Sequence, residues 1–288
     1  MNNIVGAMLK KYSCHSMRDY ENAMKEIVQE LALLGLWRAK FFEHAAFYGG
    51  TSLRILYGLD RFSEDLDFSL LAPKHDFSMK PYLKTIAEEI TGAGLHAYVT
   101  EKEKTKESAI QSAFIKGGTL SNLIAIETPK ELISRMHDNQ LIKIKIEVDT
   151  NPPLNFNTEA KHLLQPIPFS VLSYQLPDLF AGKAHALLCR EWQTRVKGRD
   201  WYDFVWFIAN DIPIHTAHLK TRLVQSNAWE PDEPFTEQDV RRLLSQKINQ
   251  IDFEQAKCDV LPFLRRQEAV QLWAPDFFLG LLGKMRCV

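Results

Sequence analysis

The segment 49-GGTSLR-54, closely followed by 61-RFSEDLDF-68, is the part of this chain that decides its fold and chemistry. Two adjacent glycines allow a backbone turn to approach a ligand closely, and a helix that starts there directs unpaired amide groups at a bound phosphate. Asp65 and Asp67 are two residues apart, so in a strand both carboxylates lie on one face, where a metal ion can bind them. The segment therefore predicts a site for a nucleoside triphosphate with a divalent cation.

Length and composition set the frame around this segment. The chain has 288 residues, with 35 lysines and arginines against 36 aspartates and glutamates. This length fits one large domain or two modest ones, and we expect two. Since the charge is almost balanced, nucleic acid can be attracted only by a local patch. Four widely separated cysteines, without a signal peptide or a long apolar run, predict a cytoplasmic protein with no membrane segment.

Periodic patterns predict the elements around the segment. Apolar residues recur with helical spacing over 19–37, and Gly58 is suited to end the short helix that follows the glycines. Strands are expected at 65–70 and 141–150, the second from strict alternation of apolar and charged residues. A further helix (81–93) and two extended segments (95–100 and 112–115) are expected between these strands.

The C-terminal part has a different pattern. A segment with several prolines, from Asn151 through Pro168, is expected to connect the two parts. Helical patterns dominate after it, near residues 177–192, 200–209, 214–226, 237–249 (with Thr236 as its cap), 253–265 and 267–285. We therefore expect an α+β fold with a small mixed β-sheet flanked by helices in a core domain (1–172). A mainly helical C-terminal domain (173–288) is expected to complete the active-site cleft.

A third acidic residue is expected from the second strand. An isolated Asp-x-Asp motif is most simply a solvated turn. Here the motif follows a Gly-Gly helix start, and a second acid-bearing strand is also expected, so the three elements together favour a metal site. Glu147 is the first choice because apolar residues flank it in mid-strand, and Asp149, on the same face, is the alternative. Oxygen ligands of this kind suit magnesium, or manganese in its place.

Several polar side chains near the glycines have two possible roles. Thr51 and Ser52 can cap the predicted helix or bond to a phosphate oxygen. Arg54 and Arg61 can pair with phosphates or with nearby Glu64. The sequence leaves each of these alternatives open.

A third group of charged residues lies further along the chain. Lys183 falls within the apolar stripe of a predicted helix, so it needs a partner or must extend into a cleft, unless it reaches past the stripe to water. Between Lys183 and Arg199 there are five basic residues and one acidic residue, Glu191, which is a local excess of four positive charges. Such a patch attracts a triphosphate or an RNA backbone. Asp200 and Asp203 then either cap the next helix or take part in catalysis.

These motifs also resemble a known family. GGTSLR, RFSEDLDF and the later AGKAHALLCR and RVKGRDWYDF are similar, in the same order, to the AbiEii/AbiGii toxin nucleotidyltransferases of the DNA polymerase beta-like superfamily, over about residues 45–210. The superfamily often has Gly-Ser where this chain has Gly-Gly-Thr-Ser, a form usual in this branch. The resemblance implies that Gly49, Gly50 and Thr51 belong to a triphosphate-binding motif, Asp65 and Asp67 to a metal-binding pair, and Lys183, Asp200 and Asp203 to downstream family motifs with catalytic roles. Beside it, the residue patterns lead us to expect Glu147 (or Asp149) as a further metal ligand and Ser52, Arg54, Ser63 and Lys183 as nucleotide-binding residues.

The resemblance also implies a biological role. Members of the family are typically toxins of bacterial toxin-antitoxin or phage-defence pairs, neutralised through a cognate antitoxin, and several relatives transfer nucleotides onto tRNA. The expected activity is metal-dependent transfer of a nucleoside monophosphate from a nucleoside triphosphate to an acceptor hydroxyl, on RNA such as tRNA. Two alternatives remain at this stage: a module that binds a nucleotide or a partner without turnover, and a metal-dependent phosphodiesterase.

Overall fold

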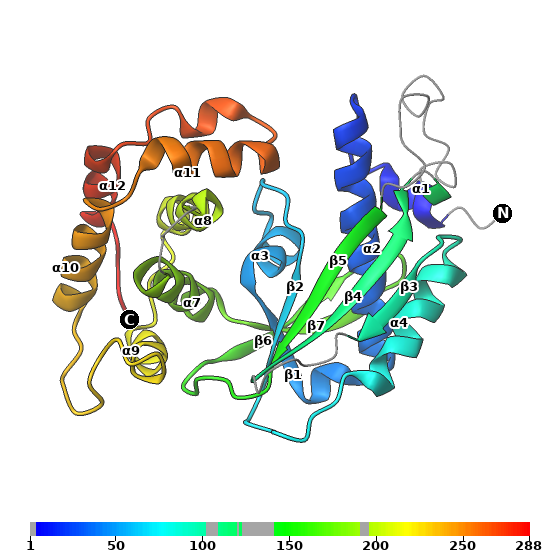
Figure 1. Cartoon of the computed structure of the whole chain (residues 1–288), viewed down its shortest axis with the longest axis horizontal. Helices are drawn as coiled ribbons and strands as arrows, with labels where there is room; N and C mark the ends of the chain where they lie inside the picture. The colour runs from blue at the N-terminus through cyan, green and yellow to red at the C-terminus, as the bar shows by residue number, and fades with distance from the viewer. Residues whose placement is uncertain (1–3, 102–108, 120, 123–140, 191–195) are drawn as a thin grey trace. The chain divides into compact units, whose positions relative to one another are not determined.

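The structure is a computed structural model that describes residues 4–101, 109–119, 121–122, 141–190 and 196–288 (Figure 1). It divides into two compact units. Unit 1 comprises Met1–Gly58, Phe62–Pro152 and Ala160–Ser173, and unit 2 comprises Leu59–Arg61, Pro153–Glu159 and Tyr174–Val288. The chain therefore passes between the two units more than once.

Unit 1 is built on a seven-stranded sheet with the order β3-β4-β5-β2-β1-β7-β6. The strands are β1 (Ala45–Tyr48), β2 (Leu66–Leu70), β3 (Tyr98–Glu101), β4 (Ile110–Gly118), β5 (Leu141–Asp149), β6 (Thr158–Leu163) and β7 (Phe169–Tyr174). β2 runs parallel to β5, and β1 runs parallel to β7, whereas the pairs β1/β2, β3/β4 and β4/β5 are antiparallel. The sheet is mixed, and helices flank it (Figure 1), which confirms the predicted fold class.

One face of this sheet carries the core of unit 1. The helices of this unit are α1 (Ile4–Leu9), α2 (Met17–Arg38), the 3₁₀ turn η1 (Phe41–Glu43), α3 (Gly49–Tyr57) and α4 (Lys80–Gly92). Helix α2 packs on α4 and β5. Phe47 and Phe68 stack on the core face with 5.1 Å between ring centroids, and Ile144 and Ile146 are fully buried in the same cluster. The charged residues of β5 consequently lie on the opposite face.

Unit 2 is mainly helical. It contains α7 (Leu176–Cys189), α8 (Gly198–Ala209), α9 (Thr216–Gln225), α10 (Glu237–Ile248), α11 (Phe253–Val260), the 3₁₀ turns η2 (Leu261–Phe263) and η3 (Gln267–Val270), and α12 (Pro275–Leu282). Helices α7 and α8 pack against each other, and α8 packs on α11. Gly198 permits the last contact, since a Cβ atom at this position would lie 1.8 Å from the carbonyl oxygen of Ala256. The predicted cap Thr236 is confirmed, because its side chain accepts a hydrogen bond from the amide of Asp239.

Three sequence predictions about the elements are wrong. The segment from Asn151 through Pro168 is not simply a connection, because it contains β6 and β7 follows it directly. The mixed polar composition of β6, a strand at the edge of the sheet, hides it from a periodicity search. The single helix predicted over 267–285 is instead η3 and α12, since Pro275 starts α12 and lacks the amide needed to continue an earlier helix. The helix predicted over 253–265 ends at Val260.

Two predicted features lie partly outside the described residues: the helix expected over 177–192, at its end, and the basic patch, at Glu191 and Arg195. None of the described helices is both long and apolar enough to cross a lipid bilayer.

Candidate active site

The turn from β1 into α3 places the glycine motif against the first acidic motif. Gly49 is the first residue of α3 and has a left-handed φ of 83°. A Cβ atom at Gly49 would lie 2.6 Å from Oδ2 of Asp67. Glycine is therefore required twice over, for its backbone conformation and for the close approach of the carboxylate. The N-terminus of α3 and the Asp67 side chain are neighbours in unit 1, as the sequence predicted.

The second acidic strand lies directly beside the first. Asp67 of β2 is in register with Glu147 of β5, and Ser69 is in register with Asp149. Adjacent strands are about 4.8 Å apart, and paired residues project to the same face of the sheet. The alternation predicted for residues 141–150 is confirmed, because the isoleucines and Val148 are buried while Glu147 and Asp149 are half-buried on the other face. Glu147 is therefore nearer than Asp149 to Asp67.

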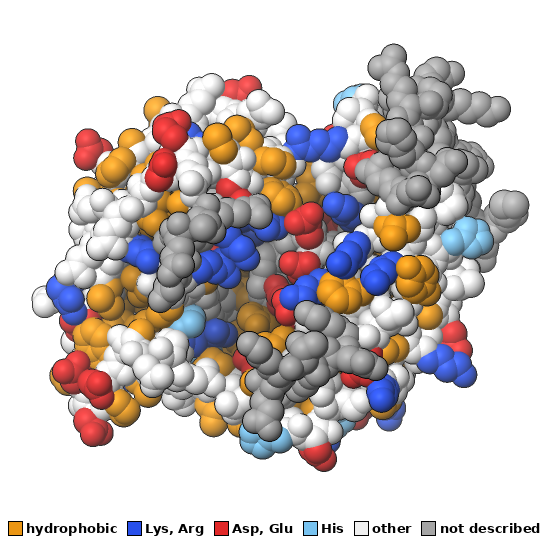
Figure 2. All heavy atoms as spheres, in the orientation of Figure 1, with side chains coloured by type: hydrophobic (Ala, Val, Ile, Leu, Met, Phe, Trp, Pro, Cys, Tyr) orange, Lys and Arg blue, Asp and Glu red, His pale blue; other side chains and the backbone are white. Residues whose placement is uncertain are grey.

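The carboxylate of Glu147 is held by a lysine of its own strand. Lys145 Nζ lies 2.6 Å from Oε1 of Glu147, and Ser112 Oγ donates to the same oxygen at 3.4 Å. Figure 2 shows acidic side chains beside lysine or arginine side chains over the region where β4 and β5 lie in Figure 1. Asp149 instead accepts a hydrogen bond at Oδ1 from the amide of Asn151, at 3.0 Å.

The acidic residues fit a magnesium ion by their chemistry, because carboxylate oxygens are its preferred protein ligands. Their arrangement fits less completely. Among the described residues, no group of three or more histidine, cysteine, aspartate or glutamate side chains is already arranged around a common metal position. Asp65 comes one residue before β2 and is half-buried. For Glu147 to share a cation with Asp67, its carboxylate must turn away from Lys145.

The two hydroxyls at the start of α3 bond to backbone. Thr51 Oγ1 donates to the carbonyl oxygen of Asp65, and Ser52 Oγ donates to the carbonyl oxygen of Gly49 at 2.8 Å. Both residues are fully buried. Of the two alternatives left open by the sequence, the structure therefore shows backbone bonding for both hydroxyls. The Thr51 bond ties α3 to the residue that leads into β2, and so holds the glycine turn and the acidic motif together.

Arg54 and Arg61 have partners that the sequence did not suggest. Arg54 Nε lies 2.7 Å from Oε2 of Glu26 on α2, and its guanidinium lies 4.7 Å from the ring centroid of Phe62. Glu64 pairs with Lys25 at 3.5 Å. Arg54 is thus held by an acid on a helix distant in sequence, a partner that neither of the two alternatives included. The backbone of Ser63 is also bonded, because its carbonyl oxygen accepts a hydrogen bond from the side chain of Gln29 at 3.1 Å.

The later charged motif forms a buried ionic cluster in unit 2. Lys183 Nζ on α7 lies 2.8 Å from Oδ1 of Asp200 and 2.7 Å from Oδ2 of Asp203, both on α8. Arg61 forms a two-point pair with Asp203, through Nε at 2.6 Å and Nη2 at 2.7 Å. Arg190 Nη1 also contacts Oδ2 of Asp200. The partner that Lys183 needs is thus supplied from within unit 2, and a contact of Lys183 with phosphate stays a prediction.

The charges of this cluster support one another. Burial by itself would lower the pKa of Lys183, but the negative charges of Asp200 and Asp203 outweigh it and raise that pKa. Burial would likewise raise the pKa of Asp200, but the charges of Lys183 and Arg190 outweigh it and lower that pKa. Lys183 and Asp200 are therefore both ionised near neutral pH. Asp203, fully buried, binds two cationic side chains at once.

The basic patch predicted over residues 183–199 is partly neutralised. Lys183 and Arg190 are paired with Asp200, which lies just beyond the sequence window that gave an excess of positive charge. Arg199 lies over the ring of Phe263, 4.2 Å from its centroid. A charge count that stops at Arg199 therefore overestimates the attraction of this region for phosphate.

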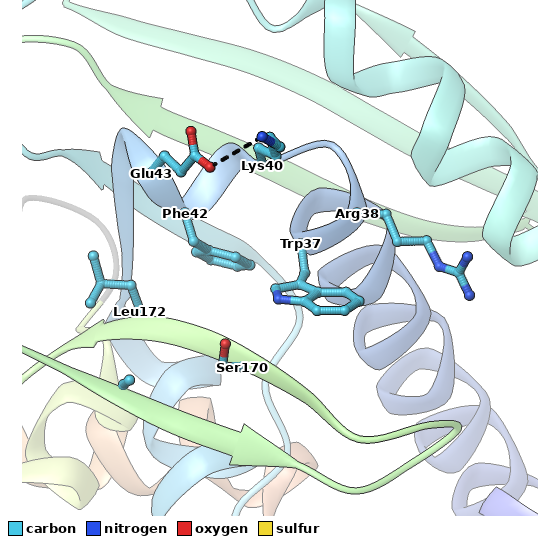
Figure 3. Close-up of a pocket in the computed structure, with 8 residues that line it drawn as sticks. Trp37, Arg38, Lys40, Phe42, Glu43, Ser170 and Leu172 are labelled. Atoms are coloured by element: carbon cyan, nitrogen blue, oxygen red, sulfur yellow. Dashed lines mark ion pairs between the residues drawn. The ribbon is translucent and has the colours of Figure 1, made fainter.

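A groove of about 730 Å³ lies elsewhere in unit 1 (Figure 3). It is lined by Trp37, Arg38, Lys40, Phe42, Glu43, Ala160, Ser170 and Leu172. The rings of Trp37 and Phe42 flank it, and Lys40 pairs with Glu43 at 3.7 Å (Figure 3). None of the predicted site residues lines this groove, so it is separate from the glycine turn and the acidic strands.

Unit 1 thus combines a mixed sheet with a glycine turn beside carboxylates on adjacent strands. A family model described as the nucleotidyl transferase AbiEii toxin of type IV toxin-antitoxin systems matches residues 31–278. The chain therefore belongs to the AbiEii family of nucleotidyltransferase toxins, and the predicted resemblance is confirmed. Membership of this family implies nucleotidyltransferase activity and an antitoxin partner.

Solved structures show similarity of a weaker kind. The structure of JHP933 from Helicobacter pylori has a TM-score of 0.44 and 16% sequence identity, covering 90% of this chain and 87% of that one. A second crystal structure, titled as a nucleotidyltransferase from H. pylori, has a TM-score of 0.43 and 15% identity, with 90% of both chains covered. No curated protein matches the sequence.

Proposed function

We propose that this protein transfers a nucleoside monophosphate from a nucleoside triphosphate to an acceptor hydroxyl on RNA, such as tRNA. Asp65, Asp67 and Glu147 hold the Mg²⁺ that accompanies the triphosphate. The observation that carries the proposal is the contact of Gly49 with Asp67, with Glu147 in register beside it. This contact brings the start of a helix, which favours phosphate, next to carboxylates, which favour a cation.

The reaction exchanges one phosphate ester for another. The acceptor oxygen attacks the α-phosphorus in line, a new P–O bond forms, the bond between the α-phosphorus and its bridging oxygen breaks, and pyrophosphate leaves. The hydroxyl proton passes to a nearby carboxylate or to water. When bound, the divalent cation neutralises phosphate charge and lowers the pKa of the attacking hydroxyl.

The residues of unit 1 have separate roles in this proposal. Gly49 and Gly50 leave room for the triphosphate at the start of α3, and Thr51 and Ser52 keep that turn in place through their backbone bonds. Asp67 and Glu147 lie on adjacent strands of one sheet face, which favours Glu147 over Asp149 as the third ligand. Glu147 would hold the cation with a carboxylate that is now paired with Lys145.

The cluster of unit 2 has a supporting role in the proposal. Lys183 belongs to the downstream family motif and is suited to neutralise charge on the leaving group. Asp200 and Asp203 keep Lys183 charged and fixed in position, since they hold its ammonium at 2.8 and 2.7 Å. These two aspartates act through Lys183 in this scheme.

One experiment tests the proposal directly. Purified protein is incubated with Mg²⁺, total cellular RNA and each of the four α-labelled nucleoside triphosphates in turn. We expect labelled RNA and an equal amount of pyrophosphate with at least one triphosphate, and neither product after chelation of the metal or with Asp67→Ala.

Other results would contradict it. RNA that is shortened and never labelled would indicate a phosphodiesterase. No labelled product, together with cellular toxicity that survives Asp67→Ala, would indicate a binding module without turnover.

A further inference from the structure

The face of the sheet that carries Glu147 also carries a line of lysines. Lys116 of β4 is in register with Lys143 of β5, and Phe114 is in register with Lys145. Tyr98 of β3 is in register with Lys116. Residues paired across neighbouring strands project to the same face. We call these five residues the lysine stripe.

The stripe combines positive charge with exposed aromatic surface. Lys143 Nζ lies 4.3 Å and Lys116 Nζ lies 5.7 Å from the centroid of the Phe114 ring. Tyr98 is 52% exposed, a high value for a tyrosine in a sheet. Figure 2 shows lysine or arginine side chains interleaved with hydrophobic ones in the region of β3, β4 and β5. Such a surface offers phosphates a counter-charge and offers bases a stacking partner.

The stripe leads to the candidate active site. Along β5, Lys143, Lys145 and Glu147 project to one face at successive alternate positions, with about 6.7 Å between neighbours in a strand. Ser112 is in register with Glu147, and Asp67 is in register with Glu147 on its other side. Charge on this face therefore changes along β5, from basic at Lys143 to acidic at the carboxylates.

We propose that the lysine stripe binds an unpaired segment of the acceptor RNA and leads it to the carboxylates of Asp67 and Glu147. This inference rests on the proposed function, since it gives the acceptor of that reaction its binding surface. The lysines occupy two successive register positions on this face of β4 and β5, Lys116/Lys143 and Phe114/Lys145. This length exceeds what one phosphate group requires, so it favours a polymer with several phosphates as the ligand. The aromatic rings favour an unpaired strand, because bases in a duplex are stacked on one another and are not available to Phe114 or Tyr98.

RNA binding without chemistry tests the stripe. A fluorescently labelled, unstructured RNA of about a dozen nucleotides, a length within the site sizes of single-strand binding proteins, is titrated with the protein in EDTA, with anisotropy as the readout. The double variant Lys116→Glu/Lys143→Glu should weaken binding by at least about tenfold and make the dependence of log K on log salt shallower by about 1.4. Phe114→Leu should weaken binding about fivefold or more and leave the salt dependence unchanged, because stacking releases no counterions.

A charge reversal outside the stripe is the control. Lys84 of α4 has a side chain that is 85% exposed and pairs with Glu88 of its own helix at 3.6 Å, so Lys84→Glu should bind RNA like the wild type. Thermal melting of every variant checks that the fold is retained, and Lys143→Gln provides a milder change.

The possible results separate the two proposals. Equal RNA affinity of the double variant and Lys84→Glu would overturn the stripe, as would tighter binding of a polyglutamate peptide than of the RNA. RNA binding that depends on the stripe, without any transfer to RNA, would instead leave the stripe in place and contradict the proposed function.

Discussion

The two units place similar charged residues in opposite surroundings. In unit 2, Arg61 and Asp203 pair with each other, and their side chains are 2% and 0% exposed. In unit 1, Lys145 and Glu147 pair with each other, and their side chains are 32% and 30% exposed. A buried pair has already lost its water and depends on its partner, whereas a half-exposed pair can exchange its partner for a ligand at little cost. Burial therefore distinguishes the Arg61–Asp203 pair, which maintains the fold, from the Lys145–Glu147 pair, which can exchange its partner for a ligand.

The largest effect should come from breaking the buried cluster. Asp203→Ala leaves the guanidinium of Arg61 and the ammonium of Lys183 without their shared partner, because Asp203 binds both. Removing one member of such a cluster costs about 3–5 kcal/mol of unfolding free energy. Urea denaturation of Asp203→Ala and Asp67→Ala measures the contrast, and Asp67→Ala should stay within about 1 kcal/mol of the wild type. Equal loss in both variants would mean that the two regions do not differ in this way.

The next effect concerns the choice of the third metal ligand. Glu147→Gln should lower the rate of nucleotide transfer about 100-fold, or about 2.7 kcal/mol, because it removes a charged ligand beside Asp67. Asp149→Asn should lower the rate less than about threefold, a difference of under 1 kcal/mol. Initial rates at saturating Mg²⁺ and triphosphate measure both. A larger loss in Asp149→Asn would assign the third ligand to Asp149.

Acid should destabilise the interior of unit 2 through His218. Burial and the charge of Arg222 lower the pKa of His218 to about 3, while Nδ1 contacts the carbonyl oxygen of Leu154 and Nε2 accepts from Arg222 Nε. Above an unfolded pKa of about 6.5, the ring is neutral in both states and this contribution to stability is complete. As the pH falls below that value, only the unfolded chain binds the proton, so stability is lost by about 1.4 kcal/mol per pH unit.

Replacement of this ring measures its contribution. His218→Gln keeps a donor and an acceptor but does not titrate. Between pH 7 and pH 5, the wild type should lose about 2 kcal/mol more than the variant, by urea denaturation at each pH. Identical losses would show that His218 does not determine the acid sensitivity.

The smallest effect separates backbone strain from the contact at Gly49. Gly49 and Gly94 have left-handed φ values of 83° and 87°, but a Cβ atom meets Asp67 at Gly49 and nothing within 4 Å at Gly94. Alanine at either position should cost about 1 kcal/mol of stability through strain. Gly49→Ala should also lower transfer about tenfold, or about 1.4 kcal/mol, because it displaces the Asp67 carboxylate. Matched losses of activity in both variants would remove Asp67 from the explanation.

Local features of the fold were predictable from the sequence. The strands near residues 65–70 and 141–150, the left-handed end of α3 at Gly58 and the cap at Thr236 each depend on residues within a few positions of one another. The faces of β5 followed from alternation alone. The AbiEii motifs were recognisable for a related reason, since their order along the chain does not depend on the tertiary structure.

Partners distant in sequence were not predictable. Arg61 pairs with Asp203, 142 residues away, and Arg54 pairs with Glu26, 28 residues away. The sequence does not show that the lysines of β4 and β5 lie beside each other and in line with Glu147, because this follows from the register of the two strands. The acceptor surface therefore could not be inferred from the alternation that had already shown those lysines.

By itself the sequence determined which side chains face together along one strand or helix, and which motifs follow one another, because backbone geometry fixes both over short distances. Only the tertiary structure decided which strands are neighbours and which charges are buried. Those choices depend on how the sheet and helices pack, and packing brings together residues that the chain itself keeps far apart. In this protein, packing gives two aspartates different surroundings: Asp203 is enclosed between two cationic side chains, and Asp67 lies against a glycine at the start of a helix.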